Sequence, residues 1–366
     1  MKLKLFCILL LLASNLATVG YAQNDNHTLV GAIRWEGWGD DPKWANNLKP
    51  EQWHYRLPFY AKVSEGKFEV RSDNQQVMDE EIKYASAAGL DYWAFCYGDG
   101  EFKEKKKIGI PLLLSSPYKD RINFSVILLG GNKQEWHGDV DQLISLFKEP
   151  TYQKVLGGRP LVYWFYLEKL PEAFGSEKAS NEAIKYLRAE AVKAGLQPPY
   201  LVAMNPPGGA KAVDTLGLDA MSAYTMSGDS QTTERKEYPY SRLAKINRDY
   251  WDACKAAGKE VVPIVNTGWD ARPRWWDMEL MKLYQGGERP WFTRATPSDI
   301  AGNLKDAIEW NKRNPVAGKT DAVIIYAWNE TDEGGWLVPT ISEGTARLDA
   351  VKTVIFEERA GTRSTP

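Results

Sequence analysis

Histidine and cysteine are scarce in this sequence, with three residues of each among 366. A Ser-His-Asp or Cys-His catalytic device needs a histidine base on a well-placed loop, and tetrahedral zinc sites need clusters of His or Cys. The GxSxG segment of many serine hydrolases is also missing. These features argue against serine, cysteine and zinc hydrolysis, and we expect neither a metal ion nor a cofactor. Only Cys96 and Cys254 lie beyond residue 22, and we expect two separate buried thiols.

Phosphate-binding signatures and an excess of basic charge are lacking as well. No GxGxxG or GxxxxGK[ST] segment follows the first predicted strand. The 46 Lys and Arg residues are balanced by 48 Asp and Glu residues, whereas binding to nucleic acid needs a basic excess on some face. We therefore expect no nucleic-acid partner. At 43% hydrophobic and 26% charged residues, the composition is that of an ordinary soluble globular protein.

The only long apolar run lies at the amino terminus. Lys2 and Lys4 form a short basic head, an apolar run follows from Leu5 to Ala13, and Gly20-Tyr21-Ala22 offers a small-x-small cleavage site. The run is shorter than the ~20 residues that a membrane-spanning helix requires. We therefore predict a cleavable signal peptide over residues 1–22. The mature chain is expected to be periplasmic or secreted and to have no membrane span.

Short apolar runs rich in Val, Ile, Leu and aromatic residues recur along the whole chain, which is typical of parallel strands buried on both faces. Segments with apolar residues at three and four spacing lie between them and end at a glycine or proline, as helices do. This alternation predicts an α/β protein with a single (β/α)8 barrel over residues 23–366, with two ordinary domains as the alternative. The eight runs are Leu29–Arg34, Asp91–Cys96, Asn123–Leu129, Pro160–Phe165, Tyr200–Met204, Ala220–Tyr224, Val261–Val265 and Ala322–Trp328.

Aromatic residues are abundant, with 15 Trp, 18 Tyr and 11 Phe. In a (β/α)8 barrel the functional side chains lie on the loops after the carboxyl ends of the strands. An indole ring there offers a flat surface to the apolar face of a sugar. We predict that Trp35, Trp269 and Trp328 border one open cleft. By the loop rule, the candidate substrate-binding residues are Trp35, Glu36, Tyr97, Asn132, Asn205, Tyr224, Trp269, Asp270, Arg272, Trp328 and Asn329.

Asp270 and Arg272 follow the seventh predicted strand directly. They either form a surface ion pair with each other or present hydrogen-bonding groups to sugar hydroxyls. A surface ion pair is worth only ~0–1 kcal/mol. We therefore expect the substitution Asp270→Ala to weaken substrate binding and to leave the melting temperature nearly unchanged.

The segment after the eighth strand, WNETDEGG, carries three acidic residues within four positions: Glu330, Asp332 and Glu333. Cleavage of an acetal needs one carboxyl group to protonate the leaving oxygen and a second to support the attack, and it requires no metal ion. With histidine so scarce, this is the chemistry that the sequence favours. Glu330 and Glu333 are the candidate catalytic residues.

Three segments resemble glycoside hydrolase family 99, which contains endo-α-mannosidases and endo-α-mannanases, and the related WbsX-like and family 71 proteins. IIYAWNETDEGGWLVP (Ile324–Pro339) resembles the strand-eight motif of these proteins. VPIVNTGWDARPR (Val262–Arg274) is similar to their segment after strand seven, and DEEIKYASAAGLDYWAFCY (Asp79–Tyr97) to their first helix and second strand. The resemblance spans most of the mature chain and implies a barrel that acts on carbohydrate.

The resemblance also implies roles for the two glutamates. Glu333 matches the general acid/base of the mannosidases, and Glu330 matches the residue that deprotonates the 2-hydroxyl of the sugar, giving a 1,2-anhydro intermediate and net retention. Thr331 stands where many relatives have Trp, and Val338 precedes Pro339 where they often have Glu. Both differences touch the sugar-facing loop and leave the α-mannoside specificity open.

These observations predict an exported glycoside hydrolase that cleaves α-glycosidic bonds in a polysaccharide or glycan. Two alternatives stay open. A WbsX-like glycosyltransferase would use a nucleotide-sugar donor, which export and the missing phosphate-binding loop argue against. A non-catalytic carbohydrate-binding barrel would keep the aromatic platforms and would need neither glutamate.

Overall fold

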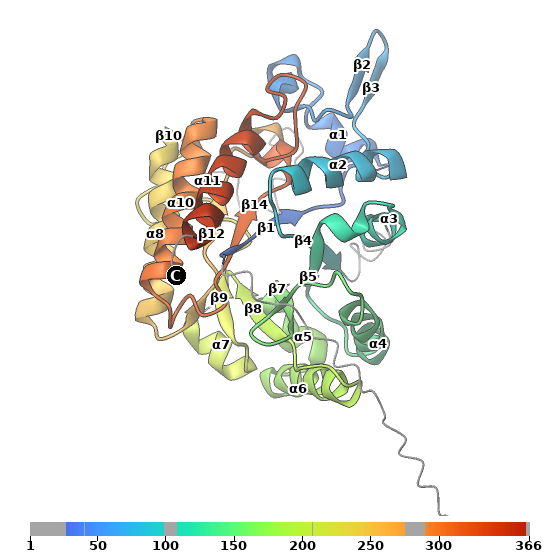
Figure 1. Cartoon of the computed structure of the whole chain (residues 1–366), viewed down its shortest axis with the longest axis vertical. Helices are drawn as coiled ribbons and strands as arrows, with labels where there is room; N and C mark the ends of the chain where they lie inside the picture. The colour runs from blue at the N-terminus through green and yellow to red at the C-terminus, as the bar shows by residue number, and fades with distance from the viewer. Residues whose placement is uncertain (1–26, 40, 99–107, 207, 275–289, 364–366) are drawn as a thin grey trace, which may run out of the picture.

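The computed structural model describes residues 27–39, 41–98, 108–206, 208–274 and 290–363. The predicted signal peptide lies outside these ranges. In the described part of the chain, eight parallel strands in sequence order form the centre of the molecule (Figure 1). They lie within two residues of the eight predicted runs. The strands are β1 (Leu29–Arg34), β4 (Tyr92–Gly98), β5 (Asn123–Leu129), β7 (Arg159–Phe165), β8 (Tyr200–Met204), β9 (Ala220–Ser222), a seventh strand in two pieces, and β14 (Ala322–Tyr326).

The seventh strand closes the sheet into a barrel. Its first piece, β11 (Glu260–Val261), pairs with β9, and its second piece, β12 (Ile264–Asn266), pairs with β14. Pro263 separates the two pieces because proline has no N–H to give to a neighbouring strand. Its carbonyl oxygen still accepts a hydrogen bond from Ile324 N at 3.0 Å. Because β1 pairs with both β4 and β14, the ring is complete and the predicted (β/α)8 barrel is confirmed.

Helices surround the strands, as Figure 1 shows. The periodic segments of the sequence form amphipathic helices whose apolar side faces the sheet; in α2, for example, Met78, Ile82 and Ala85 are fully buried. Among the described residues, no helix has the length and apolarity that crossing a membrane would require. The helices between and after the strands are α2 (Gln75–Ala87), α3 (Gly109–Ser115), α4 (Trp136–Phe147), α5 (Leu170–Phe174), α6 (Glu177–Lys193), α7 (Ala210–Leu216), α8 (Tyr240–Ala256), α10 (Pro297–Arg313) and α11 (Ala346–Arg363).

The loops of the barrel contain further short strands and short helices. The pair β10–β13 is parallel, and β2–β3, β6–β7 and β15–β16 are antiparallel. The short strands are β2 (Lys62–Ser64), β3 (Lys67–Glu69), β6 (Lys154–Val155), β10 (Glu237–Tyr238), β13 (Trp291–Phe292), β15 (Asn329–Glu330) and β16 (Gly335–Trp336). The short helices are α1 (Pro42–Asn46), η1 (Glu51–Arg56), η4 (Lys119–Arg121), η5 (Leu167–Lys169), η6 (Arg272–Arg274) and η7 (Thr331–Glu333).

The segment between β1 and α2 packs against the loops after strands seven and eight. The Trp38 indole donates to the carbonyl of Asn329 at 2.8 Å, and Asn47 Nδ2 donates to Asp332 Oδ2 at 2.8 Å. The Arg56 guanidinium donates to the carbonyl of Asp270 at 2.8 Å. This long first loop therefore fixes the backbone of the two loops that carry the acidic residues.

A buried ion cluster joins the barrel to α2. Arg34, at the end of β1, has no exposed surface and donates to Glu36 Oε1 and Glu81 Oε2, each at 2.7 Å. The second oxygen of Glu81 accepts from the Trp328 indole at 2.9 Å. Arg34 also lies over the ring of Trp93, 4.9 Å from its centroid. Strand one, the loop after strand eight and α2 are thus joined by one cluster of charged groups that is buried from water.

We predict that Glu81→Ala lowers the free energy of unfolding by about 3–5 kcal/mol, because it leaves Arg34 buried with one carboxylate and the Trp328 N–H without a partner. Glu80 is the matched control, since its side chain is 42% exposed and pairs with Lys83 on the surface. Glu80→Ala should cost about 0–1 kcal/mol. Urea unfolding of both variants checks this, and equal losses would contradict it.

Candidate active site

The loops after strands seven and eight pack so closely that glycine is required on both. Gly334 has a left-handed backbone with φ 87°, and a Cβ placed there would lie 2.6 Å from the backbone nitrogen of Asp270. A Cβ on Gly268 would lie 2.2 Å from the carbonyl oxygen of Gly334. Asp270 N donates to the carbonyl of Glu333 at 2.7 Å. This contact brings the seventh-strand loop directly beside both candidate catalytic glutamates.

Arg274 binds all three acidic residues of the strand-eight loop. Its Nε and Nη2 donate to the two oxygens of Asp332 at 2.6 and 2.9 Å. Nη2 also lies 3.4 Å from Glu330 Oε2, and Nη1 donates to Glu333 Oε1. One guanidinium therefore holds three carboxyl groups in a fixed arrangement at the carboxyl end of the barrel.

Each candidate catalytic glutamate also accepts a hydrogen bond from a tyrosine. Tyr224 Oη donates to Glu330 Oε1 at 2.6 Å, and Tyr326 Oη donates to Glu333 Oε2. Burial, with the nearby carboxylates, raises the pKa of both phenols well above the usual range. Both tyrosines therefore keep their protons and act as hydrogen-bond donors to the glutamates.

The three carboxyl groups carry more negative charge than Arg274 can balance. Glu330 is 3% exposed, Asp332 0% and Glu333 7%. Burial, and next the charge of Glu333, raises the pKa of Glu330 to about 8. Burial thus favours the protonated form of Glu330 near neutral pH, and acetal cleavage needs a carboxyl group that keeps its proton there. Within the described ranges, no group of three or more His, Cys, Asp or Glu has an arrangement that could hold a metal ion.

Three other residues predicted from the sequence lie at or next to this cluster: Trp35, Trp269 and Asn205. The guanidinium of Arg274 lies over the rings of Trp35 and Trp44, 5.5 and 4.9 Å from their centroids. Trp269 contacts Tyr326, with 6.1 Å between ring centroids. The backbone N–H of Tyr224 donates to Asn205 Oδ1 at 2.7 Å, so Asn205 positions a residue of the site and does not face the carboxylates itself.

Trp328, Asn329 and Glu36 are predicted to face the substrate. In the structure they are buried and contact other residues of the protein. Trp328 has no exposed surface and donates to Glu81. Trp35 and Trp269 are buried as well, with 6% and 3% of their surface exposed, so the prediction that the three border one open cleft is wrong. Asn329 makes two hydrogen bonds with the backbone of Trp35, at 2.9 and 2.7 Å, which join the first and eighth loops. Glu36 is buried against Arg34.

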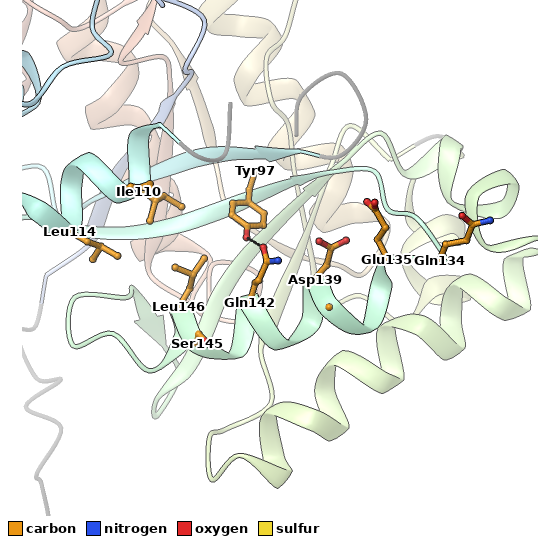
Figure 2. Close-up of a pocket in the computed structure, with 11 residues that line it drawn as sticks. Tyr97, Ile110, Leu114, Gln134, Glu135, Asp139, Gln142, Ser145 and Leu146 are labelled. Carbon is orange, nitrogen blue, oxygen red and sulfur yellow. Dashed lines mark hydrogen bonds between the residues drawn. The ribbon is translucent and has the colours of Figure 1, made fainter. Parts of the chain in front are cut away.

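Tyr97 and Asn132 lie away from the carboxyl cluster. Successive side chains of a strand point to opposite faces; Cys96 faces the barrel interior, with Sγ 3.3 Å from Tyr224 Oη, so Tyr97 faces the helices. Its hydroxyl donates to Gln142 of α4 at 3.0 Å, beside a pocket of about 730 Å³ between α3 and α4 (Figure 2). Asn132 accepts a hydrogen bond from Gln134 N in the turn before α4.

Asp270 and Arg272 do pair, with Arg272 Nε 2.7 Å from Asp270 Oδ1. Asp270 is only 5% exposed, however, and it also accepts from the buried Arg56. The two arginines hold the pKa of Asp270 below its usual value against the opposing effect of burial. The pair therefore does not lie on the surface, because the long first loop covers this carboxylate, and the structure gives reason to expect a larger loss of stability on Asp270→Ala than the sequence suggests.

Sequence reasoning missed two residues that define the site. Arg274 ends the segment NTGWDARPR, which was recognised as functional, but nothing in the local pattern distinguishes it from Arg272. Tyr326 belongs to the predicted eighth strand, and only the alternation of its side chains about the barrel could have indicated that it faces inward. Asp332 was noticed among the acidic residues without a role.

The fold and the cluster define a (β/α)8 barrel protein with three buried carboxyl groups at the carboxyl end of its strands. The model of the family described as Glycosyltransferase WbsX matches residues 124–351, and the chain belongs to this family. Among solved structures, a GH99 endo-α-mannosidase from Bacteroides thetaiotaomicron is similar with a TM-score of 0.61 and 13% identity, over 92% of this chain and 98% of that one. A structure titled glycoside hydrolase-like protein gives 0.59 and 13%, over 90% and 94%. No curated protein matches the sequence.

We predict that Asp270→Ala lowers the free energy of unfolding by about 3–5 kcal/mol, because Arg56 loses the carboxylate that balances its buried charge. Asp249 is a matched control, since it is 53% exposed and pairs with Lys245 on the surface of α8. Asp249→Ala should cost about 0–1 kcal/mol. Chemical denaturation of the two variants decides this, and an Asp270→Ala protein as stable as the wild type would refute it.

The raised pKa of Glu330 has a consequence for stability. Between about pH 4.5 and 8, Glu330 holds its proton in the folded protein and loses it in the unfolded chain. The stabilising contribution of protonated Glu330 is therefore complete below this window and is lost as the pH rises through about 8. Glu330→Gln is neutral at every pH and should remove up to about 1.4 kcal/mol per pH unit from the slope of stability against pH. The exposed Glu182→Gln should keep the wild-type slope. Parallel slopes for all three proteins would contradict this prediction.

Proposed function

We propose that the protein is an exported, retaining glycoside hydrolase that cleaves α-glycosidic bonds in a polysaccharide or glycan. The observation that carries the proposal is the buried pair Glu330 and Glu333, which share Arg274 and each accept a hydrogen bond from a tyrosine. Hydrolysis of an acetal by this chemistry requires two carboxyl groups, of which one carries a proton. The fold likeness to an endo-α-mannosidase supports the same class of substrate.

The resemblance to family 99 gives Glu333 the role of acid and Glu330 that of base toward the sugar 2-hydroxyl. Burial and the charge of Glu333 raise the pKa of Glu330, so in this scheme the proton of the resting site is placed on Glu330. We propose that substrate binding moves this proton to Glu333, which then protonates the leaving oxygen while Glu330 accepts the proton of the 2-hydroxyl as its oxygen attacks the anomeric carbon. Water then opens the 1,2-anhydro ring; Glu333 takes the proton of the water and Glu330 returns a proton to the 2-oxygen, which restores both groups.

The remaining residues of the cluster have supporting roles in this scheme. Arg274 contacts both glutamates and stabilises whichever one is ionised, so the proton can move without changing the total charge of the site. The Tyr224 and Tyr326 hydroxyls fix the orientation of the two carboxyl groups. Trp35 and Trp269 are the indoles that remain beside the cluster and are proposed to contact the sugar.

The family description supports a second candidate, a glycosyltransferase. Such an enzyme would transfer a sugar from an activated donor to a hydroxyl group, whereas a hydrolase transfers it to water. The predicted signal peptide favours the hydrolase and a periplasmic or extracellular location, because nucleotide-sugar donors are kept in the cytoplasm. A barrel that only binds carbohydrate has no use for two buried glutamates, whose desolvation costs free energy.

Digestion of a panel of α-linked glycans separates these possibilities. A hydrolase generates new reducing ends with water as the only other reactant, a transferase requires an added sugar donor, and a binding barrel gives no product. We expect new reducing ends from at least one α-linked glycan, with none from the Glu330→Gln protein. A product that forms only when a nucleotide sugar is added would establish the transferase.

The roles of the glutamates are tested with activated aryl glycosides, whose leaving groups depart without protonation. Glu333→Gln should lose about 10²- to 10⁴-fold in rate on natural glycans and be relatively spared, in the glycosylation step, on aryl substrates. Glu330→Gln should be slow on both, because it acts on the attacking side. The reverse pattern would make Glu330 the acid, and full activity of either variant would remove that residue from the mechanism.

A further inference from the structure

A second charged site lies on the other side of the loops after strands seven and eight. A cavity of about 170 Å³ lies between these loops, the first loop and β13, and four arginines line it: Arg56, Arg272, Arg294 and Arg347. We call it the arginine cavity. The backbone of Gly268 and Gly334 separates it from the carboxyl cluster, so it directly adjoins the site proposed for catalysis.

The charge of this cavity is not balanced. Arg56 and Arg272 share one carboxylate, Asp270, and Arg294 and Arg347 share another, Glu343. Glu237 is the one further acid in the lining, and it accepts from the Trp291 indole at 3.3 Å. Four guanidinium groups therefore face three carboxylates. Burial, together with the charge of Arg294, lowers the pKa of Arg347 to about 10 although Glu343 opposes this, as expected where positive charge is crowded.

The cavity also has hydrogen-bond donors that are not used. The indole N–H groups of Trp269 and Trp336, which both line it, are buried and have no acceptor among the residues that the structure describes. Within the described residues, Arg294 uses only Nη2, toward Glu343, and Arg272 uses Nε and Nη2, toward Asp270. A buried N–H without an acceptor is destabilising, and an oxygen-rich anion in the cavity would supply the missing acceptor.

We propose that the arginine cavity binds one oxyanion, a carboxylate, sulfate or phosphate group carried by a sugar of the substrate. Arginine guanidinium groups match the planar carboxylate and the tetrahedral oxyanions with paired hydrogen bonds. The loops after strands seven and eight are also where many (β/α)8 barrels bind anions. As a statement about the substrate, this rests on the proposed function: the glycan is anionic, and its charged group lies next to the bond that is cleaved.

The exposed end of the cavity supplies a variant that tests this. Arg294 is 45% exposed, and its partner Glu343 still pairs with Arg347 when Arg294 is replaced. We therefore expect the Arg294→Gln protein to fold. Arg313→Gln is the matched control, because Arg313 is exposed at the end of α10, away from these loops. Glu237→Gln changes the charge of the lining in the opposite direction.

Calorimetric titration at constant ionic strength with glucuronate, glucose 6-sulfate, glucose 6-phosphate and neutral glucose is the experiment. We expect at least one charged sugar to bind about tenfold or more tightly than glucose, and which one does so identifies the anion. Arg294→Gln should remove most of this preference, Arg313→Gln should keep it, and Glu237→Gln should increase it. Equal binding of all four sugars, or a preference that survives Arg294→Gln, would overturn the proposal.

Repeating the titration with the Glu330→Gln protein separates this proposal from the proposed function. Binding needs no bond cleavage, so the preference for a charged sugar should persist in that variant. If the protein hydrolyses neutral α-glycans and shows no such preference, the hydrolase stands and the anion site falls. If the preference is present and no glycan is hydrolysed, the anion site stands alone.

Discussion

The binding of three carboxyl groups by the single guanidinium of Arg274 is the interaction on which the candidate site depends. Without it, Glu330, Asp332 and Glu333 would repel each other in a place that water barely reaches. With it, the three carboxyl groups can share one buried place, and the pKa of Glu330 is raised so that its protonated form is favoured. The raised pKa of Glu330 is thus a property of the cluster, set by burial and by the ratio of one cation to three acids.

The loops keep this arrangement through contacts that cross the top of the barrel. Asn329 joins the eighth loop to the first, Asn47 of the first loop supports Asp332, and Gly268 and Gly334 let the seventh and eighth loops touch. Because each loop starts from a neighbouring strand, the rigid sheet beneath determines how far they can move. Charged residues that resemble surface residues in the sequence become parts of the framework in this way.

The same two loops separate two regions of opposite charge. On one side three acids face one arginine, and on the other four arginines face three acids. Asp270 belongs to the basic side, and its backbone nitrogen binds the carbonyl of Glu333 on the acidic side. A sugar with one negative group could place that group in the arginine cavity while the neighbouring glycosidic oxygen lies near the glutamates. This would select for an anionic substrate without a further domain.

The sequence by itself determined the barrel and its strands, because the strands are continuous apolar runs and the helices between them have their own period. It also determined that Glu330 and Glu333 lie together, since they are three positions apart in one short segment, and it determined the family, since three motifs occur in order. Tertiary structure alone decided which loop residues face the site. The candidates Tyr97, Glu36 and Trp328 lie at strand ends but turn away from the site. The direction of a side chain depends on the register of the strand and on partners such as Glu81 that are distant in the chain. Arg274 and Tyr326 join the cluster for the same reason: a charge or hydroxyl acquires its role from what the folded chain places within hydrogen-bonding distance.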